Sequence, residues 1–351
     1  MSDQVRAALS AVVDGRTLTV DEARDAMGSV MDGEATPALL AALLVALRMR
    51  GETVDELTGF ATAMRERATR VEAPDGAIDT CGTGGDASGT FNISTTAALV
   101  VAAAGVPVAK HGNRAMTSKS GSADVLDALG VRIDHDAASA SAALRDVGFA
   151  FMFAPGFHPA MKHAGPTRRE IGVRTAFNLI GPLTNPAGAR RQLIGVADPV
   201  AAAKLAEVLH RLGADRAFVV GGDGIDELPL DGSGVIHDVS PEGVTVRPVD
   251  AMDLGLARAA TVKLSGGTPE ENARITEAIL HGEPGARRDV VLLNAGAAFV
   301  VAGVVEDLAA GVDRAALTID AGLATELLEA LRGERRAAEA ARPPVPEGAP
   351  A

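Results

Sequence analysis

The chain has 351 residues, and at roughly 150 residues per domain this length predicts two or three folding units. Acidic residues number 46 against 33 Lys and Arg, a formal net charge of -13, which argues against a surface that binds nucleic acid or anionic membranes. The absence of Trp and Tyr excludes a tyrosine general acid and leaves few platforms for stacking single-stranded bases. The single cysteine, Cys81, excludes an internal disulfide and a zinc site built from several cysteines.

Targeting signals are not visible in the sequence. The N-terminus lacks the basic and apolar pattern of a signal peptide, and the longest apolar stretch, 97–109, is too short to span a membrane. Together with the single cysteine, this favours a cytoplasmic protein.

Residues 1–72 are expected to form a helical domain. The segment Thr19–Glu22 has the pattern of a capping box, and Pro37 opens an apolar helical stretch that Gly51 closes.

Short β-like runs followed by glycines and helices begin at Gly76. The clearest βαβ unit has strands at 193–197 and 217–220, joined by a helix that runs from Asp198-Pro199 to Leu212. Further strands are expected at 77–79 and 106–109. The pattern predicts an α/β domain, 73–164 and 191–340, with a mostly parallel sheet covered by helices.

Two further segments have simple structural interpretations. Phe149, Phe151 and Phe153 alternate as on a strand, which places three core side chains on one sheet face. The tail, 341–351, contains four prolines and is expected to be disordered.

Three glycines follow the first expected strand, within Asp79–Asp86. Their backbone N–H groups, with Ser94 or Thr95 where an apolar helix begins, suit an anion such as phosphate. A tight glycine turn with Ser94 as an ordinary N-cap is the alternative. The spacing matches neither the Walker A nor the dinucleotide-binding pattern.

Cations and hydroxyls follow the second expected strand, from Lys110 to Asp124. At the carboxyl end of a parallel strand they suit a ligand with several phosphate oxygens. Taken singly, Lys119 would be a solvated charge and His111 a structural histidine.

Adjacent carboxylates follow the strand at 217–220, in the segment Asp223–Glu227. They suit Mg²⁺, although an acidic loop alone is usually a solvated turn. A buried arginine in the segment 158–186 could bind a carboxylate through two hydrogen bonds. Arg169 and Arg174 fit equally well as ties between helix ends and the second domain.

In this order, the segments Gly-Thr-Gly-Gly-Asp, Asn-Ile-Ser-Thr, Lys-His-Gly-Asn-Arg, Gly-Pro-Leu-Thr-Asn-Pro and Asp-Glu resemble the anthranilate phosphoribosyltransferase family, from the helical start through Ala330. The resemblance implies a small helical domain beside a larger α/β domain, with the active site between them and homodimers formed through the helical domains. It also implies that a segment at about 165–190 returns to the helical domain. It implies transfer of a phosphoribosyl group from phosphoribosyl pyrophosphate to the amine of anthranilate, in tryptophan biosynthesis, with Mg²⁺ as cofactor.

The resemblance also implies site residues. Ser94, Asp226 and Glu227 would bind Mg²⁺, and Gly82, Asn113 and Arg168 would meet anthranilate. Asn113, Arg168 and Lys110 would have catalytic roles. The phosphoribosyl pyrophosphate ligands would be Gly82, Gly85, Asp86, Thr90, Asn92, Ile93, Ser94, Thr95, Lys110, His111, Gly112, Asn113, Arg114, Ala115, Met116, Thr117, Ser118 and Ser122.

Two departures from the family pattern concern loop shape. Gly221 stands where the family commonly has a histidine, and Thr117-Ser118 where Ser-Gly or Ser-Ser is common. Two alternatives remain: a pyrimidine nucleoside phosphorylase, whose Lys-His-Ser prefix is absent before this glycine loop, and a nucleic-acid-binding paralogue, which would need a basic outer surface.

The distribution of charge reconciles the acidic chain with a polyanionic substrate. No acidic residue lies between Asp86 and Asp124, and Glu170 is the single acid between Val147 and Ala197. Because both segments carry several cations, we expect an acidic surface around a locally cationic cleft.

Overall fold

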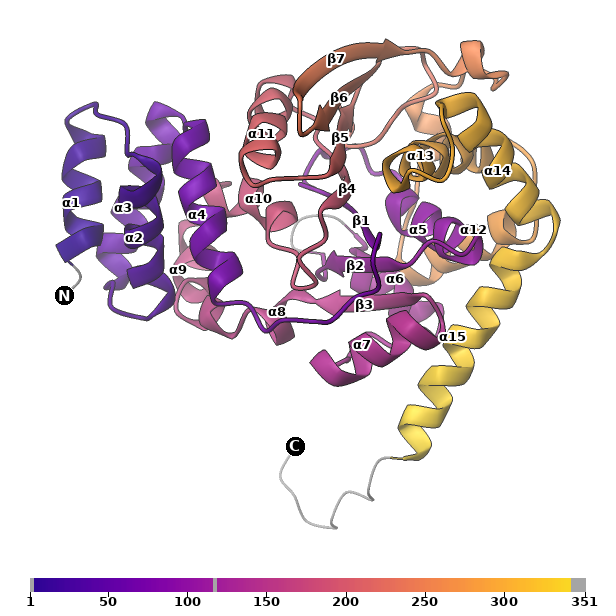
Figure 1. Ribbon diagram of the computed structural model, residues 1–351, viewed down its shortest axis with the longest axis horizontal. Helices are drawn as coiled ribbons and strands as arrows, with labels where there is room; N and C mark the ends of the chain where they lie inside the picture. Colours follow the sequence, from indigo (N-terminus) through magenta and orange to yellow (C-terminus); the bar gives the residue numbers. More distant parts are fainter. Residues whose placement is uncertain (1–2, 116–118, 342–351) are drawn as a thin grey trace.

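The computed structural model describes residues 3–115 and 119–341. Four helices open the chain and form a bundle at one end of the molecule (Figure 1): α1 (Asp3–Val13), α2 (Val20–Met31), α3 (Pro37–Arg50) and α4 (Val54–Glu66). The expected capping box is present, because the Thr19 hydroxyl accepts from the Glu22 N–H and the Glu22 carboxylate accepts from the Thr19 N–H. Pro37 and Gly51 bound α3 as expected.

A seven-stranded sheet forms the centre of the larger part, in the order β3-β2-β1-β4-β5-β6-β7. The first five strands in this order are parallel, whereas β6 pairs antiparallel with β5 and β7 pairs antiparallel with β6. The expected mostly parallel sheet is therefore confirmed. The strands are β1 (Ile78–Gly82), β2 (Val108–Gly112), β3 (Phe149–Phe153), β4 (Arg191–Gly195), β5 (Arg216–Gly221), β6 (Gly234–Ser240) and β7 (Gly243–Val249).

The sequence pattern located β1 to β5, most of them with displaced ends, and did not predict β6 and β7. β1 and β2 extend three residues beyond the expected ends at 79 and 109, whereas β4 begins and ends two residues before the expected 193–197. The extra residues at the ends of β1 and β2 include glycine, lysine and histidine, which carry no strand pattern of their own. Their extended conformation comes from pairing with neighbouring strands.

Helices cover both faces of the sheet. They are α5 (Ile93–Ala103), α6 (Ser122–Ala128), α7 (Ala137–Asp146), α8 (Ala154–Phe157), α11 (Pro199–Arg211), α12 (Pro269–Leu280), α13 (Ala286–Ala302), α14 (Leu308–Asp320) and α15 (Leu323–Ala340), with short 3₁₀ turns at 251–254 and 261–264. Among the described helices none is long and apolar enough to cross a bilayer.

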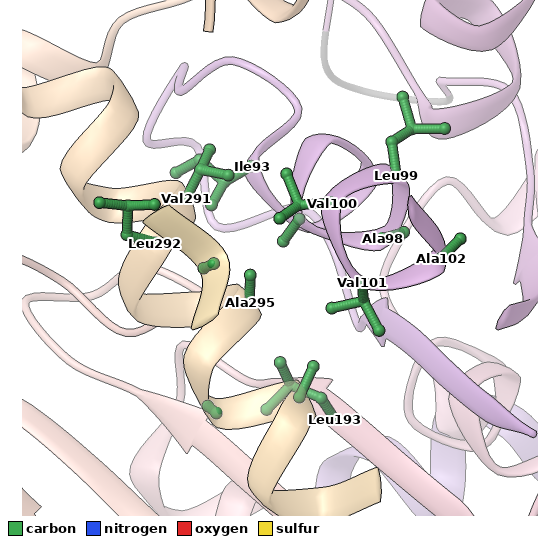
Figure 2. Close-up of a cluster of buried hydrophobic side chains, with 14 of the residues drawn as sticks. Ile93, Ala98, Leu99, Val100, Val101, Ala102, Leu193, Val291, Leu292 and Ala295 are labelled. Carbon is green, nitrogen blue, oxygen red and sulfur yellow. The ribbon is translucent and has the colours of Figure 1, made fainter. Parts of the chain in front are cut away.

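The main hydrophobic core lies between one sheet face and the helices α5 and α13 (Figure 2). Leu193 of β4 faces Val101 of α5 and Ala295 of α13 there. Phe149 and Phe151 are fully buried in this core and Phe153 packs against it, which confirms the expected shared face. Ile194 follows Leu193 in β4, and Val219 lies between Phe218 and Val220 in β5. Both Ile194 and Val219 belong to a second core on the opposite face of the sheet.

The segment after α8 packs against the N-terminal bundle. It contains α9 (Gly165–Ile171), α10 (Ala176–Ile180) and 3₁₀ turns at 159–162 and 181–183. Helix α9 contacts α3, and α10 contacts α3 and α4. These contacts support the expectation that a segment at about 165–190 returns to the helical domain, and the exact domain bounds stay a prediction. The tail expected at 341–351 lies, beyond Ala341, outside the described residues.

Candidate active site

The strand order reverses between β1 and β4, because β2 and β3 follow on one side of this pair and β5 on the other. Crevices at the carboxyl ends of strands at such a switch point are where open α/β sheets bind ligands. Gly82 and Gly195 pair at this end. A Cβ on Gly82 would lie 2.6 Å from Asp226 Oδ2, and one on Gly195 would lie 1.7 Å from the Asp226 carbonyl oxygen. The two glycines therefore make room for the acidic loop at the switch point.

The acidic pair is hydrogen-bonded to the glycine loop and to α5. The N–H of Gly84 donates to Asp226 Oδ2 at 2.8 Å, and the N–H of Ser94 donates to Glu227 Oε1 at 2.9 Å. Gly84 and Gly85 have φ values of 61° and 67°, which favour glycine. Segments more than 130 residues apart in sequence thus meet at the start of α5, and the N-terminal end of a helix favours negative charge.

Helix α5 begins at Ile93, and its N-cap is Asn92. The alternative of Ser94 as an ordinary N-cap is therefore wrong, because Ser94 is the second residue of the helix and its N–H is bound by Glu227. The Ile93 side chain lies in the core and Thr95 is buried, and the Ile93 N–H donates to the Phe91 carbonyl oxygen at 2.8 Å.

Burial governs the ionisation of the pair. Removal from water raises the pKa of Asp226, and the neighbouring charge of Asp86 raises it further. Removal from water likewise raises the pKa of Glu227, with the charge of Asp226 as the next cause. Two adjacent carboxyl groups in this setting favour a bound cation, which would compensate both charges.

Lys110 lies in β2, close enough to Glu227 for the two charges to interact. Its side chain is buried and its Nζ donates to the Thr80 carbonyl oxygen of β1. Burial lowers the pKa of Lys110, while the charges of Asp79, Cys81 and Glu227 act in the opposite direction. The lysine therefore links β1, β2 and the acidic pair electrostatically.

His111, the next residue, is also buried. Its ring lies 5.1 Å from that of His158, and within the described residues the Nε2 atoms of both rings have no hydrogen-bond partner. Burial lowers the pKa of His111 to about 3 and that of His158 to about 4. Both rings are therefore neutral near pH 7.

The loop after β2 is held by its own acidic residues. Arg114 pairs with Asp124 at 2.8 Å and with Asp127 at 3.2 Å, so its charge is locally offset and the expected cationic cleft is weaker here. Asp124 also accepts from the N–H groups of Ala115 and Gly121, and the Ser122 hydroxyl donates to the Asn113 carbonyl oxygen. Met116, Thr117 and Ser118, expected ligands, lie outside the described residues.

Further expected ligands are Asp86 of the glycine loop, Thr90 before α5 and Gly112 at the end of β2. Asp86 accepts from the Ser88 N–H at 3.2 Å and from the Asp226 N–H at 3.5 Å. The Thr90 hydroxyl lies 3.2 Å from that of Ser88. Gly112 packs closely, since a Cβ there would meet the Ser122 hydroxyl at 2.3 Å.

Arg168 and Arg174 come from the segment beside the helical bundle. The Arg168 guanidinium lies 4.8 Å from the centre of the Phe177 ring, and burial lowers its pKa. No described hydrogen bond joins Arg168 to the phosphate-side residues. Arg174 donates to the carbonyl oxygens of Gly84 and Thr83, and so ties this segment to the glycine loop, as its alternative interpretation expects.

The sequence analysis missed Asn272 of α12. Its Nδ2 donates to Asn92 Oδ1 at 2.9 Å and its Oδ1 accepts from the Gly267 N–H at 2.8 Å. Asn92 in turn bonds Ser120 through both side-chain atoms. A lone asparagine in an amphipathic helix does not indicate a site by its sequence. Only the hydrogen bond to Asn92, the N-cap of α5, shows that Asn272 helps to hold the start of that helix.

The donor chemistry of the acidic loop fits Mg²⁺. Asp226 and Glu227 supply carboxylate oxygens and Ser94 a hydroxyl, which are hard ligands. The described residues hold no group of three or more His, Cys, Asp or Glu that could bind a metal alone. Mg²⁺ commonly binds through one or two carboxylates plus water and substrate phosphate oxygens, so the set fits a metal that arrives with a phosphorylated substrate.

Comparison with protein families covers most of the chain. Residues 6–68 match the helical bundle domain, and residues 74–325 the a/b domain, of a glycosyl transferase family. The two matches agree with the bundle α1–α4 and with the sheet and its helices.

Curated relatives and a solved structure give a narrower family. The anthranilate phosphoribosyltransferases of Symbiobacterium thermophilum and Chloroflexus aggregans are 53% and 54% identical, covering 93% and 94% of this chain and 97% and 99% of their own. The crystal structure of the Thermus thermophilus enzyme superposes with a TM-score of 0.89 at 46% identity, covering 94% of this chain and 99% of that one. The chain belongs to the anthranilate phosphoribosyltransferase family.

Proposed function

We propose that this protein transfers the phosphoribosyl group of phosphoribosyl pyrophosphate to the amine of anthranilate, giving N-(5-phosphoribosyl)anthranilate and pyrophosphate, a step of tryptophan biosynthesis. The observation that carries the proposal is the meeting of the glycine loop, the start of α5 and the Asp226-Glu227 pair at the switch point of the sheet. Backbone N–H groups there suit phosphate oxygens, and the carboxylates suit the accompanying metal.

Mg²⁺ is the proposed cofactor, held by Ser94, Asp226 and Glu227 together with substrate oxygens. The Saccharomyces cerevisiae anthranilate phosphoribosyltransferase, 24% identical, is known in complex with PRPP and Mg; at this identity the likeness supports the shared fold. The proposal for this chain therefore depends on its own oxygen donors. The metal would neutralise charge on the departing pyrophosphate.

The residues of the chain position the two reactants. The amine of anthranilate attacks C1 of the ribosyl ring as the bond to pyrophosphate breaks. An aromatic amine is unprotonated near neutral pH, so the reaction needs no strong general base. We assign Lys110 to the leaving-group side, and Asn113 and Arg168 to orienting anthranilate, Arg168 through its carboxylate.

A homodimer in the cytoplasm, formed through the helical bundle, is part of the proposal. Val13, Val45 and Met49 of α1 and α3 are exposed, Met49 to 84%, which supports a covered apolar face. Light scattering at micromolar concentration should give twice the chain mass; a monomer mass would remove the dimer from the proposal.

Anthranilate fluorescence tests the activity. Purified protein with phosphoribosyl pyrophosphate and Mg²⁺ should consume anthranilate, and chelation of Mg²⁺ should stop the loss. Phosphate with a pyrimidine nucleoside should give no phosphorolysis, which separates this function from the nucleoside phosphorylase alternative. Stable fluorescence with folded protein and both substrates would refute the proposal.

A further inference from the structure

A fully buried asparagine, Asn294, lies within the apolar helix α13. Asn294 Oδ1 accepts from the Leu228 N–H at 3.0 Å, and its Nδ2 donates to the Leu228 carbonyl oxygen at 3.0 Å. The same Nδ2 donates to the Val290 carbonyl oxygen at 2.9 Å. One side-chain amide thus binds both backbone polar groups of a single residue 66 positions away.

The residue held in this way follows the acidic pair directly. Leu228 is completely buried, so its N–H and carbonyl group would lack partners if the amide were absent. Glu227 is fixed from the other side by the Ser94 N–H. The backbone that carries the two carboxyl groups is therefore attached to α13 on one side and to α5 on the other.

Packing alone does not account for this asparagine. Its helical neighbours are Leu293 and Ala295, both buried apolar residues, and a polar side chain in such a core is unfavourable unless it is fully hydrogen-bonded. An apolar residue would fill the same place but would leave the buried N–H and carbonyl group of Leu228 without these partners. What the amide adds is a defined position for the backbone at Leu228.

We propose that Asn294 is a positioning residue that sets the direction of the Asp226 and Glu227 carboxyl groups toward the metal before substrate arrives. The inference rests on the proposed function, in which this pair holds Mg²⁺. Fixing the ligands in advance reduces the ordering that metal and substrate binding must otherwise supply. The residue contacts neither substrate nor metal and acts through the backbone of residue 228.

Asn294→Asp tests the inference because it keeps the shape and the acceptor to the Leu228 N–H but removes the amide donor. Calorimetric titration with phosphoribosyl pyrophosphate at a series of Mg²⁺ concentrations is the readout. We expect the variant to need at least tenfold more Mg²⁺ for half-maximal binding, with the Michaelis constant for anthranilate changed less than twofold. Val300→Ala, six residues along the same helix and buried, is the control for lost stability alone.

Other outcomes overturn the inference. An unchanged Mg²⁺ dependence in folded Asn294→Asp protein would make Asn294 a structural residue, as would an equal shift in Val300→Ala protein of matched thermal stability. If Asn294→Asp protein does not fold, hydrogen exchange of the metal-free native protein decides. The amide of Leu228 should then exchange as slowly as the middle of α13, and its exchange within seconds would refute fixation in advance.

The metal site itself is tested separately. If replacing Asp226 and Glu227 by their amides leaves the Mg²⁺ dependence unchanged, the proposed metal site fails. If that double variant loses the dependence and Asn294→Asp protein keeps it, the proposed metal site stands and the positioning role is refuted.

Discussion

The acidic pair illustrates how surroundings divide the roles of neighbouring residues. Asp223, Asp226 and Glu227 lie within five positions of one another, yet Asp223 is exposed and accepts from the Thr261 hydroxyl at 2.9 Å. Asp226 and Glu227 instead bind the glycine loop and α5. The sequence predicts an acidic loop. Only the hydrogen bonds in the fold distinguish the buried pair Asp226 and Glu227 from the exposed Asp223.

Replacing Asp226 by Asn and Glu227 by Gln should leave the fold intact and lower turnover at least about a hundredfold, the scale of losing a main electrostatic stabiliser. Steady-state kinetics with circular dichroism checks this. Asp223→Asn is the matched control and should keep turnover within about twofold. Near-normal turnover of the double variant would remove the pair from the mechanism.

Arg168→Ala should raise the Michaelis constant for anthranilate and leave that for phosphoribosyl pyrophosphate little changed. The reason is that a guanidinium held beside Phe177, with no described carboxylate partner, is free to bind a substrate carboxylate. Arg169→Ala, an exposed arginine of the same helix, is the control. Equal increases in both constants would identify Arg168 as structural.

At the scale of elements, helices α13 and α14 approach closely where two glycines face each other. A Cβ on Gly311 would lie 2.5 Å from the Gly296 carbonyl oxygen. This contact lets α13 and α14 pack closely along the helix that carries Asn294. Each helix needs a glycine at this crossing, because a side chain on either one would meet the backbone of the other helix.

Gly311→Ala should therefore destabilise the protein by about 1–3 kcal/mol through overpacking, although Ala is about 1 kcal/mol better than Gly within an ordinary helix. Gly333→Ala in α15 is the matched control, because a Cβ there meets only the end of Arg336 at 3.9 Å. It should be neutral or stabilising. Urea denaturation measures both, and equal effects would contradict the close-packing argument.

At the scale of the whole molecule, buried neutral histidines make stability depend on pH. The unfolded chain protonates each imidazole near pH 6.5, whereas burial lowers the pKa of His158 to about 4 and of His111 to about 3 in the folded chain. Unfolding takes up protons between these values, so the free energy of unfolding falls as pH decreases from 6.5 toward 4.

His158→Gln should reduce this acid-induced loss by about 2 kcal/mol between pH 7 and 4.5. Denaturant titrations at both pH values measure it as a difference from the unaltered protein. Replacing the exposed His281 by Gln gives the matched control. If the free energy of unfolding of the His158→Gln protein fell by the same amount, the His158 ring would be protonated in the folded chain at pH 4.5 as it is in the unfolded chain.

Local signals in the sequence determined many of the elements. The capping residues of α2, the Pro37 and Gly51 bounds of α3 and the alternation of Phe149, Phe151 and Phe153 act over a few residues, so the fold class followed from them. The order of the motifs likewise pointed to the family before any contact was known.

The tertiary structure alone decided which polar groups meet. The bonds from Gly84 to Asp226, from Ser94 to Glu227 and from Asn294 to Leu228 join segments 66 to 142 positions apart. Strand order and helix packing set these encounters, and no local pattern encodes them. For the same reason Arg114, a free cation in the sequence, is paired with Asp124 and Asp127 in the fold.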